Sequence, residues 1–130
     1  MSHWTDLKTQ INDLRALGDA CRELGKRLEI AAPGQQIKAR GYYGNTRSCD
    51  AVIHLDGPYD VALTRGADGK YSLTADYYSG HVARQLGEKC SKLTQLYGLH
   101  KTTALYRAKG IQTRRVMGQN GSINLIAMVP

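Results

Sequence analysis

Residues 51–77 have the sequence AVIHLDGPYDVALTRGADGKYSLTADY, and this stretch indicates most clearly how the chain folds. It contains three short segments rich in β-branched and aromatic residues, at Ala51–Leu55, Tyr59–Arg65 and Tyr71–Tyr77. Glycine, proline and aspartate separate these segments, which is typical of strands joined by turns. We expect Ala67–Lys70 to form the tip of a hairpin between the second and third segments. The stretch therefore predicts consecutive strands.

Further strands are predicted on the N-terminal side of this stretch, at Thr5–Ile11, Leu28–Ala32 and Gln36–Tyr42. A helix is predicted between the first two, because Asp13 is a suitable N-cap for the residues that follow. The apolar stripe of this helix consists of Leu14, Leu17, Cys21 and Leu24. Gly25 comes directly after the stripe and is expected to end the helix.

Residues 81–110 return to a helical period. Their apolar residues recur at spacings of three and four and form a single stripe, which consists of Val82, Leu86, Cys90, Leu93 and Tyr97. We expect Gly98 to divide the segment into two helices, the second of which runs from Leu99 to Lys109.

The C-terminal residues predict a hairpin with its turn at Asn120-Gly121, a strong signal for a two-residue turn. Such a turn would pair Val116 with Leu125 and Arg114 with Ala127. The returning strand carries apolar residues on both faces, which favours a place inside a sheet over a place at its edge.

Strand runs and helix runs are segregated along the chain, so the sequence predicts an α+β fold. We expect an antiparallel or mixed β-sheet with about three helices packed on one face, in a single domain that spans residues 1–130. The expected core residues lie on the apolar stripes and strands described above: Leu14, Leu17, Leu24, Val52, Ile53, Val82, Leu86, Leu93, Ile123 and Leu125.

The composition narrows the class of protein. Of the 130 residues, 42% are hydrophobic and 22% are charged, as is usual for globular proteins. The sequence contains no apolar run of the roughly 18 residues that a transmembrane helix needs. Residues Met1–Asp6 lack the basic and apolar regions of a secretory signal. Three scattered cysteines, Cys21, Cys49 and Cys90, favour reduced thiols and a cytoplasmic location.

The net charge of +7 is concentrated near the C-terminus. No acidic residue follows Glu88, whereas seven basic residues do: Lys89, Lys92, Lys101, Arg107, Lys109, Arg114 and Arg115. A stretch of one sign attracts an acidic protein surface or nucleic acid, although a basic surface can also serve solubility alone. Lys89 and Lys92 stand three apart on a predicted helix, so we expect them to act together.

Residues 38–47 hold the densest candidate binding site. Lys38, Arg40 and Arg47 supply cations, and Tyr42 and Tyr43 supply rings on which a base can stack. In an extended segment, Lys38, Arg40 and Tyr42 would share one face. The same residues also suit an ordinary strand followed by a Gly-Asn turn. Anion or nucleic-acid contact and a purely structural role therefore both stay open here.

A catalytic alternative depends on Asp76, His81 and His100, scattered polar residues that a fold could bring together. Asp76 could orient His81 as an acid–base pair, or Ser79 could cap a helix with His81 in its first turn. No nucleophile elbow, phosphate-binding loop or metal-ligand spacing accompanies these residues. We therefore expect no metal site and no cofactor.

Several short motifs occur in a characteristic order. They include Lys38-Ala39-Arg40-Gly41-Tyr42, Tyr71-Ser72-Leu73-Thr74-Ala75-Asp76-Tyr77 and Asn120-Gly121-Ser122-Ile123-Asn124-Leu125. In this succession, which spans nearly the whole chain, the sequence resembles the chloroplast open reading frame 35 family, hypothetical proteins of plastid genomes, cyanobacteria and other bacteria. The chain departs from the family at Trp4 and at Tyr77 or Tyr78, where a different aromatic residue is usual, and at Arg114 and Arg115, where the family is often acidic. The resemblance implies a soluble intracellular domain and no particular reaction.

Two functions follow as hypotheses. The first is a small, basic, intracellular binding or adaptor domain without catalysis, whose partner is an acidic protein surface or nucleic acid. The second is a small enzyme with a site at Asp76, His81 and His100. The uneven charge and the lack of a catalytic motif favour the binding domain.

Overall fold

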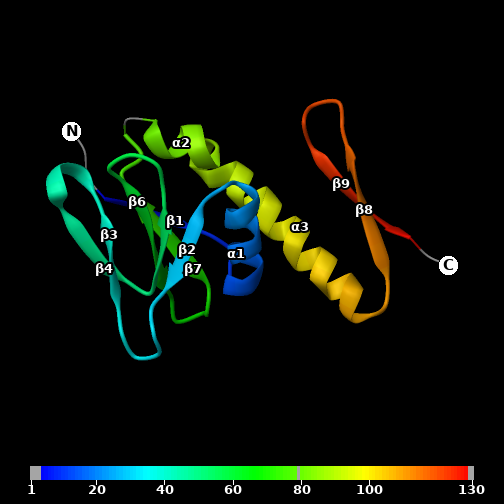
Figure 1. Ribbon diagram of the computed structural model, residues 1–130, viewed down its shortest axis with the longest axis horizontal. Helices are drawn as coiled ribbons and strands as arrows, with labels where there is room; N and C mark the ends of the chain where they lie inside the picture. The colour runs from blue at the N-terminus through cyan, green and yellow to red at the C-terminus, as the bar shows by residue number, and fades with distance from the viewer. Residues whose placement is uncertain (1–3, 79, 129–130) are drawn as a thin grey trace.

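A five-stranded antiparallel sheet lies at the centre of the protein (Figure 1). The computed structural model describes residues 4–78 and 80–128, and the strands of the sheet follow the order β1–β7–β6–β5–β2. Their bounds are β1 Thr5–Lys8, β2 Arg27–Ile30, β5 Ala51–His54, β6 Asp60–Arg65 and β7 Tyr71–Ala75. The stretch 51–77 thus forms the consecutive strands that the sequence predicts, and β1 and β2 lie at the two edges.

The described residues form three α-helices, which cover one face of this sheet (Figure 1): α1 Leu14–Glu23, α2 His81–Leu86 and α3 Ser91–Ala108. Helix α1 begins where the sequence predicts, because the Asp13 carboxylate accepts hydrogen bonds from the backbone N–H groups of Arg15 at 3.0 Å and Ala16 at 3.2 Å. The main core lies between helices and sheet and includes Leu17, Ile53, Leu73, Leu86 and Leu93. The predicted α+β class is confirmed.

A hairpin covers the opposite face of the sheet (Figure 1). It consists of β3, Ile37–Arg40, and β4, Thr46–Cys49, of which the sequence predicted only the first. The predicted continuation of β3 to Tyr42 is wrong, because the 3-10 turn η1, Tyr42–Gly44, begins there and holds Tyr43 at φ 52°. A second core cluster lies beneath the hairpin and consists of Ala39, Cys49, Val52 and Ala62.

The predicted break at Gly98 is also wrong. Gly98 lies inside α3, and the chain breaks instead at Gly87 and the 3-10 turn η2, Glu88–Cys90. Gly87 has a φ of 86°, and a Cβ placed on it would lie 2.7 Å from the backbone nitrogen of Lys92. This close approach requires glycine at position 87, whereas a glycine at an exposed position inside a helix lowers stability without ending the helix.

The C-terminal hairpin consists of β8, Gln112–Met117, and β9, Ile123–Met128. It forms a two-stranded sheet of its own beyond α3 (Figure 1), so the predicted place inside a larger sheet is wrong. Val116 pairs with Asn124, one residue out of the predicted register. The cause is the loop: the Gly118 N–H donates to the Ser122 carbonyl at 2.7 Å, which leaves three residues in the turn rather than two.

The predicted core residues fall into two groups. Leu17, Val52, Ile53, Val82, Leu86 and Leu93 are buried, whereas Leu14, Leu24, Ile123 and Leu125 are partly buried and pack against the main core. All three cysteines are buried free thiols. Burial raises the pKa of Cys21 to about 12 and that of Cys90 to about 11, so both are poor nucleophiles. Among the described residues, no helix is long and apolar enough to span a membrane.

Candidate binding surface

The predicted site at residues 38–47 occupies the β3–β4 hairpin, where two of its three cations face carboxylates. The Arg40 guanidinium donates to both carboxylate oxygens of Asp60, from Nη2 at 2.9 Å and from Nε at 3.0 Å. Arg47 Nη2 lies 4.0 Å from a carboxylate oxygen of Asp6. Lys38 is exposed on the same face of β3 as Arg40. Because β3 ends at Arg40, Tyr42 does not continue this face, contrary to the sequence prediction.

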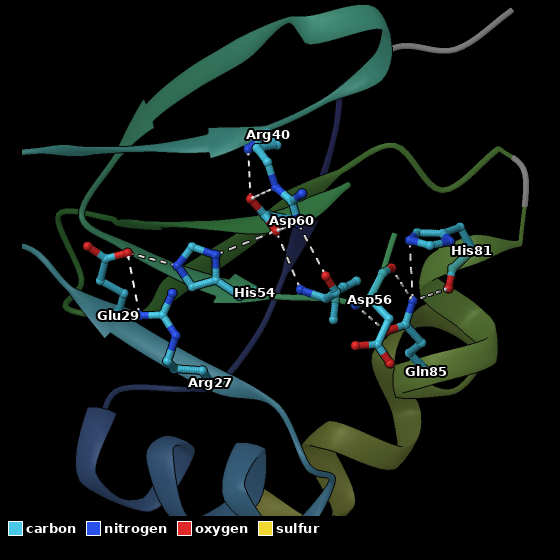
Figure 2. Close-up of polar contacts among 9 residues, drawn as sticks. Arg27, Glu29, Arg40, His54, Asp56, Asp60, His81 and Gln85 are labelled. Carbon is cyan, nitrogen blue, oxygen red and sulfur yellow. Dashed lines mark hydrogen bonds and ion pairs between the residues drawn. The ribbon is translucent and has the colours of Figure 1, made fainter. Parts of the chain in front are cut away.

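Asp60 is the centre of a polar network that joins this hairpin to the sheet (Figure 2). Its side chain is fully buried and also accepts a hydrogen bond from the Arg40 backbone N–H at 2.9 Å. His54 Nδ1 lies 3.7 Å from Asp60, and His54 Nε2 lies 2.8 Å from Glu29. Burial raises the pKa of Asp60, but the hydrogen bonds and charge of Arg40 outweigh it, so the net effect lowers the pKa. The network is suited to holding two layers together.

Tyr42 and Tyr43 line a hollow of about 490 Å³ between η1 and the loop that carries Pro58 and Tyr59. The ring centroids of Tyr42 and Tyr43 are 4.2 Å apart, and those of Tyr42 and Tyr59 are 6.3 Å apart. Tyr43 is 87% exposed. The rings are therefore accessible, but the cation in the same hollow, Arg40, is held by Asp60. Contact between Lys38, Arg40, Tyr42, Tyr43 or Arg47 and an anion or nucleic acid stays a prediction.

Lys89 and Lys92 do not share a helix, contrary to the sequence prediction. Lys89 lies in η2 with a φ of 52°, and Lys92 lies in the first turn of α3. Cys90, at φ 58°, separates them, so the spacing of three residues no longer places the two side chains on one helical face. Both are exposed, and their role in binding also stays a prediction.

The residues of the catalytic alternative lie in three different settings. Asp76 accepts a hydrogen bond from the backbone N–H of Tyr78 at 3.0 Å. His81 packs edge-on against Tyr59, with ring centroids 5.2 Å apart, and lies 3.3 Å from the Gln85 amide nitrogen (Figure 2). His100 Nε2 lies 2.7 Å from Glu23. Among the described residues, Asp76 and His81 thus form no hydrogen bond or ion pair with each other, and His100 is paired with Glu23 instead. The cap expected from Ser79 lies outside the described residues.

A groove that the sequence reasoning missed lies between α1 and β2. It has a volume of about 550 Å³, and its basic lining residues are Arg15, Arg22, Lys26 and Arg27. Asp19 is the acidic residue that lines it. Arg15, Asp19 and Arg22 stand three or four residues apart on α1 and so project from one side of the helix. This spacing was the available signal, but the first 50 residues carry eight basic and six acidic residues, and so small an excess drew no attention to it.

A second hollow, of about 450 Å³, lies on the other side of α1, against α3. Arg15 lines this hollow as well and meets Arg107, a residue of the basic C-terminal stretch. Nearby, Nη1 and Nη2 of Arg115 donate to the two carboxylate oxygens of Glu23, at 2.8 and 3.1 Å. The hydrogen bond from Arg115 lowers the pKa of Glu23, and His100 contributes in the same direction. Within residues 4–78 and 80–128, no group of three or more acidic, histidine or cysteine side chains could hold a metal ion.

The fold and these surfaces define an α+β domain with a cationic groove between α1 and β2 and a hollow of mixed charge between α1 and α3. Residues 22–126 match the model of the family described as "Protein of unknown function (DUF1257)", and the chain belongs to this family. It is similar to the "Uncharacterized protein ycf35" of Pyropia yezoensis, with 27% identity over 127 residues, which cover 97% of this chain and 95% of that protein. The resemblance to the chloroplast open reading frame 35 family is confirmed. No solved structure matches the chain significantly.

Proposed function

We propose that the protein is a small, basic, non-catalytic binding domain that engages an acidic protein surface through the cations around α1. The observation that carries this proposal is the α1–β2 groove, in which four cations, Arg15, Arg22, Lys26 and Arg27, accompany one acid, Asp19. Arg15 also lines the hollow against α3, where Arg107 lies together with Asp13 and Asp19. Because cations outnumber acids in the groove, their combined field attracts an acidic ligand.

The arginines around α1 are able to exchange partners, whereas the largely buried Lys26 donates to Asp56 at 2.9 Å and is held there. Arg22 is paired with Asp19 at 2.9 Å, but both side chains are largely exposed, and an exposed pair contributes only about 0–1 kcal/mol. Arg27 lies 4.0 Å from Glu29, also at the surface. Neither Arg15 nor Arg107 has an ion pair with another described residue. An acidic ligand therefore meets only weak competition for the arginines of this surface.

The lining residues favour a protein partner over nucleic acid. The α1–β2 groove includes apolar side chains, Leu14, Leu28 and Ile30, but no aromatic ring on which a base could stack. The separate settings of Asp76, His81 and His100 give no support to the enzyme hypothesis. The three free buried thiols support a reducing compartment such as the cytoplasm.

The proposal can be tested by fluorescence anisotropy with two labelled probes, a heptaglutamate peptide and a single-stranded oligonucleotide of equal charge. We expect the peptide to bind and the double variant Arg15→Glu/Arg107→Glu to weaken binding about tenfold or more. The double variant Lys8→Glu/Arg65→Glu changes the net charge equally at exposed positions outside the candidate sites and is the matched control. Equal weakening by both variants, or binding of the oligonucleotide alone, would contradict the proposal.

A further inference from the structure

Strand β2 is an edge strand whose outer side is open. Within the described part of the chain it pairs only with β5, in the register Arg27 with His54 to Ile30 with Ala51. In the same register, the N–H of Ala31 donates to the carbonyl of Asp50 at 3.0 Å. Inward and outward backbone groups alternate along an antiparallel strand. The N–H and C=O groups of Leu28 and Ile30 therefore point away from β5, and no other described backbone segment is bonded to them.

The open side of β2 borders the basic groove described above. Leu28 and Ile30 line that groove, and Ile30 is 53% exposed. Opposite them, α1 contributes Gly18, the position at which a Cβ would lie 3.8 Å from the Leu28 side chain. Glycine in a helix interior costs up to about 1 kcal/mol relative to alanine, and here it leaves space between helix and strand. An extended segment placed in this groove would meet unpaired backbone groups on one side and Arg15 and Arg22 on the other.

From this geometry we infer that an acidic segment of a partner protein binds in extended form, as an additional strand on β2. The inference rests on the proposed function and specifies how the partner is held. Backbone hydrogen bonds to Leu28 and Ile30 supply the pairing, and the cations of the groove select acidic side chains. A second copy of this chain is disfavoured as the added strand, because two β2 edges side by side would bring their Arg15, Arg22 and Arg27 side chains together.

The backbone pairing is tested with a labelled peptide in which glutamate and valine alternate over seven residues. The variant Ile30→Pro removes one outward N–H and leaves the ladder to β5 intact, because proline is tolerated on edge strands where the N–H faces solvent. We expect Ile30→Pro to weaken peptide binding about fivefold to tenfold, and Ile30→Val, the control, to bind like the wild type. Circular dichroism establishes that each variant is folded.

A second measurement needs no change in the protein. Two versions of the peptide carry N-methyl groups on alternate residues, one on the valines and the other on the glutamates. In a peptide added to β2 as a strand, either the N–H groups of the valines or those of the glutamates face β2, but not both. We expect one version to lose at least about tenfold in affinity and the other to bind like the unmethylated peptide. Equal behaviour of the two versions would overturn the inference even if Ile30→Pro fails to fold.

The groove itself is tested at Gly18. The variant Gly18→Leu fills the space between α1 and β2, whereas Gly18→Ala makes only an ordinary contact with Leu28. We expect the leucine variant to abolish binding of the alternating peptide and the alanine variant to retain it. If substitution of Arg15 weakens peptide binding but Gly18→Leu and Ile30→Pro do not, the proposed function stands and strand addition is contradicted. A peptide that does not bind at all would contradict both.

Discussion

Asp60 shows how one side chain can hold two layers of a protein together. Its buried carboxylate accepts three hydrogen bonds from Arg40, which belongs to the hairpin on the face of the sheet opposite the helices, while Asp60 itself begins β6. A buried charge is costly unless it is paired, so the hairpin cannot leave this position without leaving the carboxylate unsatisfied. The network therefore explains why Arg40 is unsuited to an outside ligand.

We expect Asp60→Asn to lower the free energy of unfolding by about 1–3 kcal/mol, because the buried charge-assisted bonds to Arg40 are lost. The pKa of Asp60 is lower in the folded protein than in the unfolded chain, so its contribution is present above the unfolded value of about 3.9 and disappears as the pH falls through the folded value. Urea unfolding from pH 7 to pH 2 measures both effects. A difference between wild type and variant that does not shrink in acid would contradict this assignment, and Asp19→Asn, at an exposed pair, is the control.

At the scale of elements, the sequence predicted the helices and strands correctly wherever residues close together in the chain determine the structure. The Asp13 cap and the strands of residues 51–77 are such cases. The helix break was mislocated because both Gly87 and Gly98 fit a break equally well by residue type, and only the approach of Lys92 to position 87 distinguishes them. Likewise, β4 has no apolar alternation of its own, and it forms because β3 and the second core cluster lie beside it.

Replacement of these two glycines by alanine should change the free energy of unfolding in opposite directions. We expect Gly98→Ala to raise the free energy of unfolding by up to about 1 kcal/mol, since position 98 is exposed inside α3 and has open space around it. Gly87→Ala should lower it by about 1–3 kcal/mol, because the new methyl group meets Lys92 at a backbone conformation that alanine rarely adopts. Urea unfolding of the two variants measures these changes. Equal effects of the same sign would contradict the boundary between α2 and α3.

At the scale of the whole molecule, the charged residues are divided between structure and surface in a way that the sequence alone does not reveal. Arg115 belongs to the basic C-terminal stretch, but it binds Glu23 of α1 and so fastens the β8–β9 hairpin to the helices. Arg107, from the same stretch, lines a hollow with Arg15. Arg115 and Glu23 are 92 residues apart in the sequence, and so are Arg107 and Arg15. The composition therefore predicted a basic surface but could not say where on the molecule it lies.

We expect Arg115→Ala to loosen the C-terminal hairpin and leave the five-stranded sheet intact. Hydrogen exchange should become about fivefold to tenfold faster at the amides of β8 and β9 and stay unchanged in β5, β6 and β7, because local opening does not require global unfolding. Arg114→Ala is the control, since Arg114 lies on the other side of the ribbon from Arg115. Equal acceleration in the central strands would show that the hairpin is part of the same cooperative unit.

The position of β1 beside β7 also has a consequence for how the chain folds as it is synthesised. Thr5 is paired with Ala75, so β1 leaves the ribosome well before its neighbour and can pair only after 70 further residues have followed. Strands β5, β6 and β7 are joined by short connections and can pair as soon as they emerge. Since pairing between distant segments closes a large loop and is slow, the N-terminal strand joins a sheet that the middle of the chain has already begun. The order of assembly is thus the reverse of the order of synthesis at this edge.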